Sequence, residues 1–229
     1  MSLFAIADTH LSLSADKPMD IFNGWSDYVQ RLEKNWRAVV SDGDTVVIPG
    51  DVSWAMSLEG AQKDFAFLNS LPGKKILMKG NHDYWWNTAR KMENFFKEKG
   101  FETLSIVHNS AVSVGNISVC GTRGWFYEEA RGEAHDRKIM LREVGRLETS
   151  LKAAGDRTKL VFLHYPPKYL GYECPEILDL LDAYHVPLCC YGHIHSRGCR
   201  SAFQGMYHDT EFRLLSADYI SFCPRRILP

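Results

Sequence analysis

Gly80-Asn81-His82-Asp83 follows a short aliphatic run, Ile76-Leu77-Met78. Such a run is typical of a buried β-strand, and the glycine that ends it lets the backbone turn sharply. An amide, an imidazole and a carboxylate then occupy successive positions. One interpretation is a polar turn, because Asn, Asp and Gly are common turn residues. The alternative is a binding site, and it gains weight because similar groups follow other strands of the chain.

The same arrangement recurs at four more predicted strands, over 3–7, 45–49, 159–163 and 186–191. Five of the nine histidines lie just past a strand, together with two acids and an amide. In chain order these residues are Asp8, His10, Asp51, Asn81, His82, His164, His193 and His195. Turn chemistry favours Gly, Asn, Asp and Pro over His. Turns therefore explain one such strand end but not five.

Helical patterns lie between the strands of the first half. Apolar residues recur every three or four positions over 25–40, and helices are also predicted over 58–71, with Ser57 as N-cap, and over 87–99. The alternation of strand and helix predicts parallel βαβ units, whose ligands bind beyond the carboxyl ends of the strands. The second half predicts a hairpin around Gly115-Asn116, helices over 135–154 and 177–184, and closing strands near 200–207 and 211–216.

The composition suits one globular domain, and we expect a single domain over 1–229. The chain has 229 residues, of which 45% are hydrophobic, and 27 basic against 28 acidic residues leave a net charge of −1. This balance gives no electrostatic footprint for non-specific binding to nucleic acid or membrane. No apolar run approaches the roughly 20 residues of a membrane span, and the N-terminus lacks a basic signal region. The six cysteines contain no C-x-x-C pair, so we expect reduced thiols and a cytoplasmic protein.

Histidines and carboxylates that converge at one edge of a sheet suit first-row transition metals. The number of candidate ligands is too large for one ion with about four to six donors. A pair of ions about 3.5–4 Å apart fits the supply better, and a pair needs an anionic bridge to offset its mutual repulsion. A carboxylate such as Asp51 can provide that bridge.

Five blocks, in this order, resemble the calcineurin-like metallophosphoesterase superfamily. A lone G-D or D-x-H is a weak signal, but five blocks in order, each after a strand, are specific. They span most of the chain and are Asp8-x-His10, Gly50-Asp51, Gly80-Asn81-His82-Asp83, His164 and Gly192-His193-x-His195. The resemblance implies a four-layer αββα sandwich, in which two mixed sheets lie between helical layers.

The resemblance also implies roles for these residues. Asp8, His10 and His195 would hold one metal ion, and Asn81, His164 and His193 would hold the other. Asp51 would bridge the two ions. The ions would be manganese, iron or zinc, since such sites accept all three. His82 would not be a ligand but would face the substrate and serve the leaving group or the phosphoryl oxygens.

The chemistry of the side chains agrees with these roles. Two cations can stabilise the charge on phosphoryl oxygens and lower the pKa of a bridging water, whose hydroxide would attack phosphorus. The imidazole of His82 can supply a proton to the leaving oxygen. Asp83 could orient a neighbouring side chain or cap the turn. Arg123, between Gly121 and Gly124, could clamp a phosphate bidentately or lie solvated in a loop.

One residue departs from a branch of the superfamily. In protein serine/threonine phosphatases the second block continues with an Asp that supports the catalytic histidine, whereas Trp54 stands at that position here. This departure argues against a protein phosphatase. We therefore expect a metal-dependent hydrolase of a small soluble phosphomonoester or phosphodiester. The alternatives are a nuclease, which the charge balance does not favour, and a non-catalytic scaffold, which would not need His82.

Overall fold

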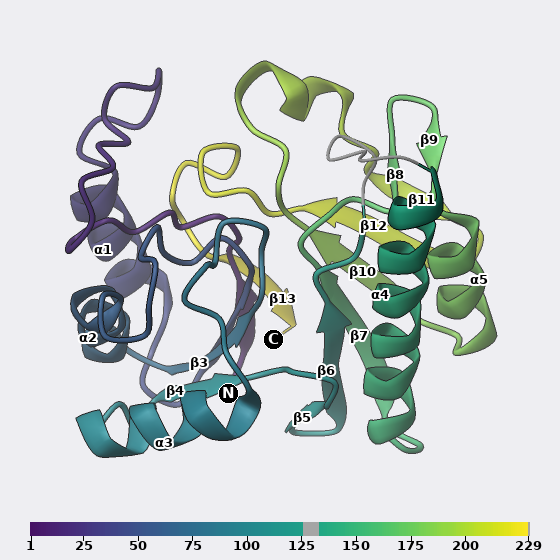
Figure 1. The fold of residues 1–229 in the computed structure, drawn as a ribbon, viewed down its shortest axis with the longest axis horizontal. Coiled ribbons are helices and arrows are strands. Elements are labelled where there is room, and N and C mark those ends of the chain that lie inside the picture. The colour runs from purple at the N-terminus through teal and green to yellow at the C-terminus, as the bar shows by residue number, and fades with distance from the viewer. Residues whose placement is uncertain (126–132, 229) are drawn as a thin grey trace.

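Two mixed β-sheets face each other in the computed structural model, which describes residues 1–125 and 133–228 (Figure 1). The first sheet has the strand order β13-β1-β2-β3-β4, and the second has the order β11-β12-β10-β7-β6-β5. Helices α1, α2 and α3 lie outside the first sheet, and α4 and α5 lie outside the second (Figure 1). The predicted four-layer αββα sandwich is confirmed.

The elements of the first sheet and its helices come mostly from the first half of the chain. They are β1 (Leu3–Ala5), α1 (Tyr28–Val39), β2 (Thr45–Pro49), α2 (Gln62–Ser70), β3 (Lys74–Met78), α3 (Ala89–Lys99), β4 (Leu104–Ile106) and β13 (Arg225–Leu228). Strands β1 to β4 pair in parallel, which confirms the βαβ units. The antiparallel edge strand β13 was not predicted, because two of its four residues are arginines and its apolar pattern is too short to recognise.

The second sheet and its helices follow in the second half. They are β5 (Val112–Val114), β6 (Ile117–Thr122), α4 (Glu133–Ala153), β7 (Thr158–Leu163), α5 (Pro175–Ala183), β10 (Leu188–Tyr191), β11 (Gly205–Tyr207) and β12 (Thr210–Leu214). The predicted hairpin joins β5 and β6. A small hairpin of β8 (Lys168–Tyr169) and β9 (Tyr172–Glu173) is too short to leave a periodic signal.

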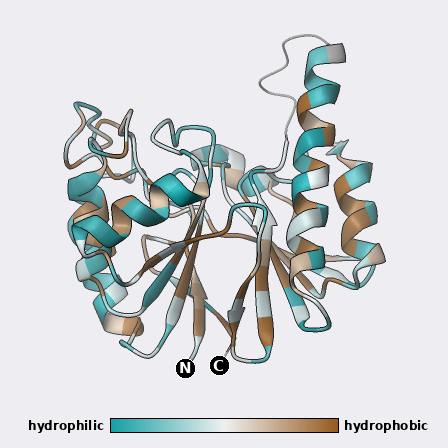
Figure 2. Ribbon diagram, turned by 60° about the horizontal axis from the view of Figure 1, so that its bottom comes forward, coloured by the Kyte–Doolittle hydropathy of each residue, from teal (hydrophilic) through white to brown (hydrophobic). Residues whose placement is uncertain are grey.

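Apolar side chains fill three layers, and strands and inward helix faces are hydrophobic (Figure 2). One cluster lies under α1 to α3 and another under α4 and α5. A third lies between the sheets, where Val47 and Met78 of the first sheet share a cluster with Val119 and Phe162 of the second. Packing of this cluster holds the two sheets against each other and brings the ends of their strands to one edge of the sandwich.

Two element boundaries differ from the sequence prediction. Helix α2 begins at Gln62 and not at residue 58, because the Ser57 hydroxyl accepts a hydrogen bond from the Gly60 N–H at 3.0 Å and closes a separate turn first. The strand expected from residue 200 begins at Gly205, and a 3₁₀ helix over Ser196–Ser201 comes before it.

The six cysteines all lie in the described residues, and all are free thiols, as predicted. None of the helices in the described ranges has the length and apolar character needed to cross a bilayer.

Candidate metal centre

The ends of five strands from both sheets meet at one edge of the sandwich and carry the candidate ligands. β1, β2 and β3 lead to Asp8, Asp51 and Asn81, whereas β7 and β10 lead to His164 and His193. Hydrogen bonds join the loops across the gap between the sheets: the His193 N–H donates to both carboxylate oxygens of Asp8, at 3.1 and 2.9 Å. The sequence blocks, far apart in the chain, therefore form one site.

The backbone of this site is strained. Asp8, His10, Asp51 and His193 have φ values of 59°, 44°, 50° and 69°, a region that side-chain-bearing residues seldom adopt. Each such residue costs of order 1–3 kcal/mol and persists only where the surrounding fold fixes it. Strain of this kind concentrates at functional sites, and four cases among adjoining residues here agree with that rule.

Two of the glycines that precede candidate ligands are explained by close packing. A Cβ atom at Gly80 would overlap the Asp51 carboxylate, and one at Gly192 would overlap the Asp8 carboxylate. Only glycine lets the backbone of one block approach the carboxylate of another so closely.

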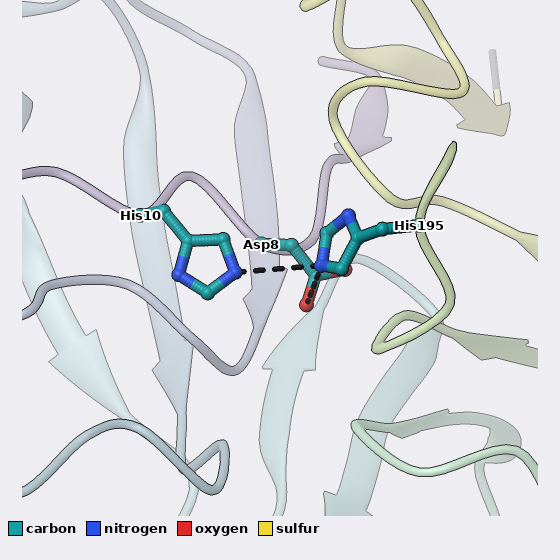
Figure 3. A group of neighbouring side chains, drawn as sticks. All are labelled: Asp8, His10 and His195. Carbon is teal, nitrogen blue, oxygen red and sulfur yellow. Dashed lines mark hydrogen bonds and ion pairs between the residues drawn. The ribbon is translucent and has the colours of Figure 1, made fainter. Parts of the chain in front are cut away.

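The first group of donor atoms comes from Asp8, His10 and His195 (Figure 3). The Nε2 atoms of His10 and His195 lie 3.4 Å apart, and His195 Nε2 lies 3.7 Å from Asp8 Oδ1. Both separations exceed the usual N–H···O range of about 2.7–3.2 Å. Two donors about 2.1 Å from one metal ion are roughly 3.0–3.4 Å apart, so the 3.4 Å separation suits a shared ion, and the 3.7 Å separation is slightly longer.

The second group shares Asp8 and adds Asp51 and His164. His164 Nδ1 lies 3.7 Å from Asp8 Oδ1, and His164 Nε2 lies 3.4 Å from Asp51 Oδ2 and 2.6 Å from Asn81 Oδ1. Asp51 Oδ2 is also 3.7 Å from His10 Nε2 in the first group. This carboxylate therefore lies between the two groups, at the place expected of a bridging ligand.

The protonation of three of the four candidate histidine ligands also fits metal ligation, whereas at His195 the charges of Asp8 and Asp218 outweigh burial and raise the pKa. Burial, and then the charge of His195, lowers the pKa of His10 well below its usual value. Burial lowers the pKa of His164 in the same way, and it lowers the pKa of His193 to about 3. All three rings are therefore neutral at pH 7, and a neutral imidazole nitrogen is the form that binds a metal ion. Burial raises the pKa of Asp8 to about 6, and a neighbouring cation would offset that effect.

Asp218 is a functional candidate that sequence reasoning missed. Its Oδ1 atom lies 2.9 Å from His195 Nδ1, and its Oδ2 atom accepts a hydrogen bond from the Ser196 N–H at 2.8 Å. A carboxylate that holds the Nδ1 proton leaves the lone pair of Nε2 directed at Asp8 and His10. Metal-binding histidines are commonly oriented in this way. Asp218 lies in a loop after β12, where no motif marks it.

The remaining predicted ligands lie close by. Asn81 contacts His164 as described, and the ring centroid of His193 is 5.1 Å from that of His164. The nitrogens of His193 belong to neither of the two donor groups. The ring instead packs edge-on against Tyr165, with centroids 4.5 Å apart. Metal ligation by His193 stays a prediction.

His82 lies at the rim of the site, half-buried, beside the donor groups. Its ring centroid is 5.9 Å from that of His10, and its backbone N–H donates to Asp51 Oδ1 at 2.9 Å. The Trp54 ring packs against both histidines, with centroids 4.4 Å from His82 and 5.0 Å from His10. Trp54 therefore contacts both histidines, stacked on His10 with ring planes 20° apart and tilted by 41° to His82.

Asp83 is fully buried and holds two loops together. Its Oδ1 atom accepts hydrogen bonds from the backbone N–H groups of Val52 and Ser53 and from the indole N–H of Trp85, at 2.9, 3.2 and 2.9 Å. Its Oδ2 atom accepts from the Gly80 N–H at 2.7 Å. These contacts position the Asp51 loop against the Asn81 loop. A catalytic role for Asp83 stays a prediction.

The Arg123 side chain is 17% exposed, so Arg123 is not a solvated loop residue. A catalytic role for it also stays a prediction.

Comparison with known proteins agrees with this geometry. The family model of the calcineurin-like phosphoesterases matches residues 1–197, and the chain belongs to this family. The family implies metal-dependent hydrolysis of phosphate esters, and the two Asp/His groups are consistent with metal binding. No curated protein matches the sequence significantly.

Solved structures share the fold at low sequence identity. A phosphopantetheinyl hydrolase from Mycobacterium tuberculosis superposes with a TM-score of 0.62 at 15% identity, with 100% of this chain and 96% of that chain covered. TT1561 of Thermus thermophilus gives 0.61 at 14% identity, with 99% and 97% covered. AQ665 from Aquifex aeolicus, described as a protein of unknown function, gives 0.53 at 16% identity, with 98% and 95% covered.

Proposed function

We propose that this chain is a phosphoesterase with a dinuclear metal centre that hydrolyses small soluble phosphate esters. The observation that carries the proposal is the pair of donor groups that share Asp8. The Asp51 carboxylate, 3.7 Å from His10 and 3.4 Å from His164, lies between them. A buried cluster of this composition, with neutral rings at His10 and His164 and with carboxylates spaced beyond hydrogen-bond distance from them, suits two cations better than one.

The proposed ligand assignment is the one that the family resemblance implies, and the two donor groups contain part of it. Asp8, His10 and His195 would hold one ion, Asn81, His164 and His193 the other, and Asp51 both. When bound, two such ions polarise phosphoryl oxygens and make a water molecule acidic enough to supply a nucleophile near neutral pH. Manganese, iron and zinc all suit a donor set of imidazole, carboxylate and amide oxygen.

His82 is the proposed proton donor to the leaving oxygen. Its half-buried ring lies beside the donor groups, so a phosphate held there brings its leaving oxygen toward the imidazole. The Trp54 ring limits the directions in which this imidazole can turn. A positioned general acid contributes about 10²–10⁴-fold to the rate.

The substrate class is proposed from charge and from the comparisons. A net charge of −1 offers little attraction for a polyanion such as nucleic acid, which favours a small ester. One structural neighbour is named as a hydrolase of a phosphopantetheinyl group, so an ester of that group belongs among the test compounds.

A rate comparison with defined substrates tests the proposal. Metal content is first measured on the purified chain, with about two transition-metal ions per chain expected. Turnover is then measured with a phosphomonoester, a phosphodiester, a cyclic nucleotide and a phosphopantetheinyl ester, with and without added Mn²⁺. At least one compound should be hydrolysed, and a chelator should abolish its hydrolysis.

Two variants make the result specific. Asp8→Asn should remove activity and metal, because Asp8 belongs to both groups. His208→Ala is the control, because His208 is exposed and pairs with Asp182 away from the site. A folded wild-type chain that binds no metal, or that hydrolyses none of the compounds with Mn²⁺, Fe²⁺ or Zn²⁺, would contradict the proposal.

A further inference from the structure

A small basic pocket adjoins the metal centre along the gap between the two sheets. Its volume is about 30 Å³, so it admits one small group and not a ring. Among the described residues that line it, the charged ones are Lys79, Arg123, Glu143 and Arg146. Trp86, His108 and Thr122 complete much of the wall. We call this feature the basic pocket.

The charges of the basic pocket do not cancel. The Glu143 carboxylate, 1% exposed, accepts hydrogen bonds from Arg146 Nη1 at 2.6 Å and Thr122 Oγ1 at 2.5 Å. Its Oε1 atom is 3.9 Å from Arg123 Nη2, too far for a hydrogen bond. One carboxylate thus faces three cationic groups, and it is engaged mainly by Arg146.

Arg123 is held in place but not satisfied. Its guanidinium lies 5.7 Å from the Tyr165 ring centroid, which supports the side chain from one side. Its Nε atom is buried and finds no hydrogen-bond partner in the described part of the chain. A guanidinium has five N–H donors in a rigid fork that matches the oxygens of a phosphate or carboxylate. A buried donor without a partner is costly, and an anionic oxygen would satisfy it.

His108 supplies a further donor. The indole N–H of Trp86 donates to His108 Nδ1 at 2.9 Å. Burial, and then the charge of Arg146, lowers the pKa of His108, so the ring is neutral at pH 7. A neutral ring that accepts at Nδ1 carries its proton on Nε2. His108 Nε2, Lys79 and Arg123 can therefore all donate hydrogen bonds at the basic pocket.

The basic pocket adjoins the metal ligands in both sheets, at the end of the same strand in the first sheet and of the adjacent strand in the second. In the second sheet Thr122 pairs with Leu163, so the next residues, Arg123 and His164, begin about 5 Å apart. The backbone carbonyl of Arg123 accepts a hydrogen bond from the His164 N–H at 3.2 Å. In the first sheet Lys79 is two residues before Asn81.

From this placement we infer that the basic pocket binds a second anionic group of the substrate, a phosphate or a carboxylate, while the scissile phosphate lies at the metal centre. The inference rests on the proposed function and narrows its substrate class. The preferred ester carries two acidic groups separated by a short linker, on the order of one or two strand spacings, or about 5–10 Å.

Binding of non-hydrolysable probes to the metal-loaded full chain tests this inference without requiring turnover. The probes are methylphosphonate, with one acidic group, and 1,3-propanebisphosphonate and 4-phosphonobutyrate, with two. Calorimetry should show that at least one of the two-group probes binds the wild-type chain about 10–100-fold more tightly than methylphosphonate, the usual worth of charge-assisted hydrogen bonds. The bisphosphonate and the carboxylate decide which second group is preferred.

The variants separate the basic pocket from chelation of the metals. Arg123→Gln and Lys79→Gln should each reduce the preference for the two-group probe about tenfold or more. Arg142→Gln is the matched control, because Arg142 lies exposed on α4 and outside the basic pocket. It should keep the full preference. Lys79→Gln also serves if the Arg123 variant fails to fold.

Each outcome decides the question. Equal affinity for one-group and two-group probes in the wild-type chain overturns the inference. So does a preference that survives in both pocket variants, since chelation by the metals alone would then explain it. Failure of the proposed function is recognised separately, as absence of turnover with a probe preference still present.

Discussion

Asp218→Asn is the most specific test of the site, because the Asp218 carboxylate contacts one member of the first donor group, His195. Asp218 Oδ1 holds the Nδ1 atom of His195 at 2.9 Å, and the carboxylate side chain is 9% exposed. The substitution keeps the size of the side chain but removes the charge that fixes the His195 tautomer. His195 would then be free to carry its proton on either nitrogen, and one tautomer cannot bind a metal ion through Nε2.

The expected magnitude follows from the role of such partners. Removing a carboxylate behind a metal-binding histidine typically lowers metal affinity about 10–100-fold. This corresponds to about 1.4–2.7 kcal/mol. The loss should fall on one ion only, because His195 belongs to the Asp8/His10 group, whereas His164 belongs to the other. The Ser196 N–H, which also donates to Asp218, can still donate to the amide oxygen.

Metal-free protein is titrated with Mn²⁺, and calorimetry or the electron paramagnetic resonance signal of free Mn²⁺ measures the affinities of the two sites. Asp182→Asn is the matched control, because Asp182 lies on α5, contacts the Nδ1 atom of the exposed His208 at 2.6 Å and belongs to neither donor group. The control should bind both ions as the wild type does. If the Asp218→Asn chain binds both ions with unchanged affinity, the proposed role of Asp218 is refuted. If the affinities for both ions fall equally, Asp218 supports the structure of the whole site and does not act through His195 alone.

Three other substitutions probe catalysis, bridging and a buried lysine. His82→Ala should keep both metal ions and lower turnover about 10²–10⁴-fold, and an unchanged rate would make His82 structural. Asp51→Asn should weaken both ions together in a metal titration, whereas loss of one ion alone would contradict bridging. Burial lowers the pKa of Lys75 to about 8, below the usual value of about 10.4. Unfolding then takes up a proton, so the free energy of unfolding, measured by denaturation against a Lys75→Met reference, should rise from pH 8 to pH 10, with exposed Lys74→Met as control.

Much of the fold was predictable because its signals are local. The strand over Thr45–Pro49 and the helix over Ala89–Lys99 each carry a complete apolar pattern, and the turn at Gly115-Asn116 carries its own hairpin chemistry. The sequence could not show the edge strand β13, which pairs with β1 across the full length of the chain. Pairing at such a separation depends on the assembled sheet and leaves no periodic pattern of its own.

The functional residues also divide into those that the sequence predicts and those that only the structure reveals. Residues that directly follow strands, such as Asp8 and His164, could be found because a buried strand marks where they lie. Asp218 and Glu143 could not, because a loop brings one and a long helix the other to the site through tertiary packing. Trp54 was visible as a departure from one branch of the superfamily, but the sequence did not show that it contacts His82.

The contact between Trp54 and His82 orients the imidazole differently from a carboxylate in the same role. A carboxylate behind a histidine fixes its tautomer and favours its charged form, through a hydrogen bond worth about 1.5–3 kcal/mol. An aromatic contact such as that with Trp54 is worth about 0.5–1.5 kcal/mol and does not select a tautomer. The same indole also packs against the metal-ligand candidate His10, with ring planes 20° apart. One aromatic side chain therefore contacts both the proposed proton donor and a candidate ligand, so a Trp54→Ala substitution would remove a packing partner from each.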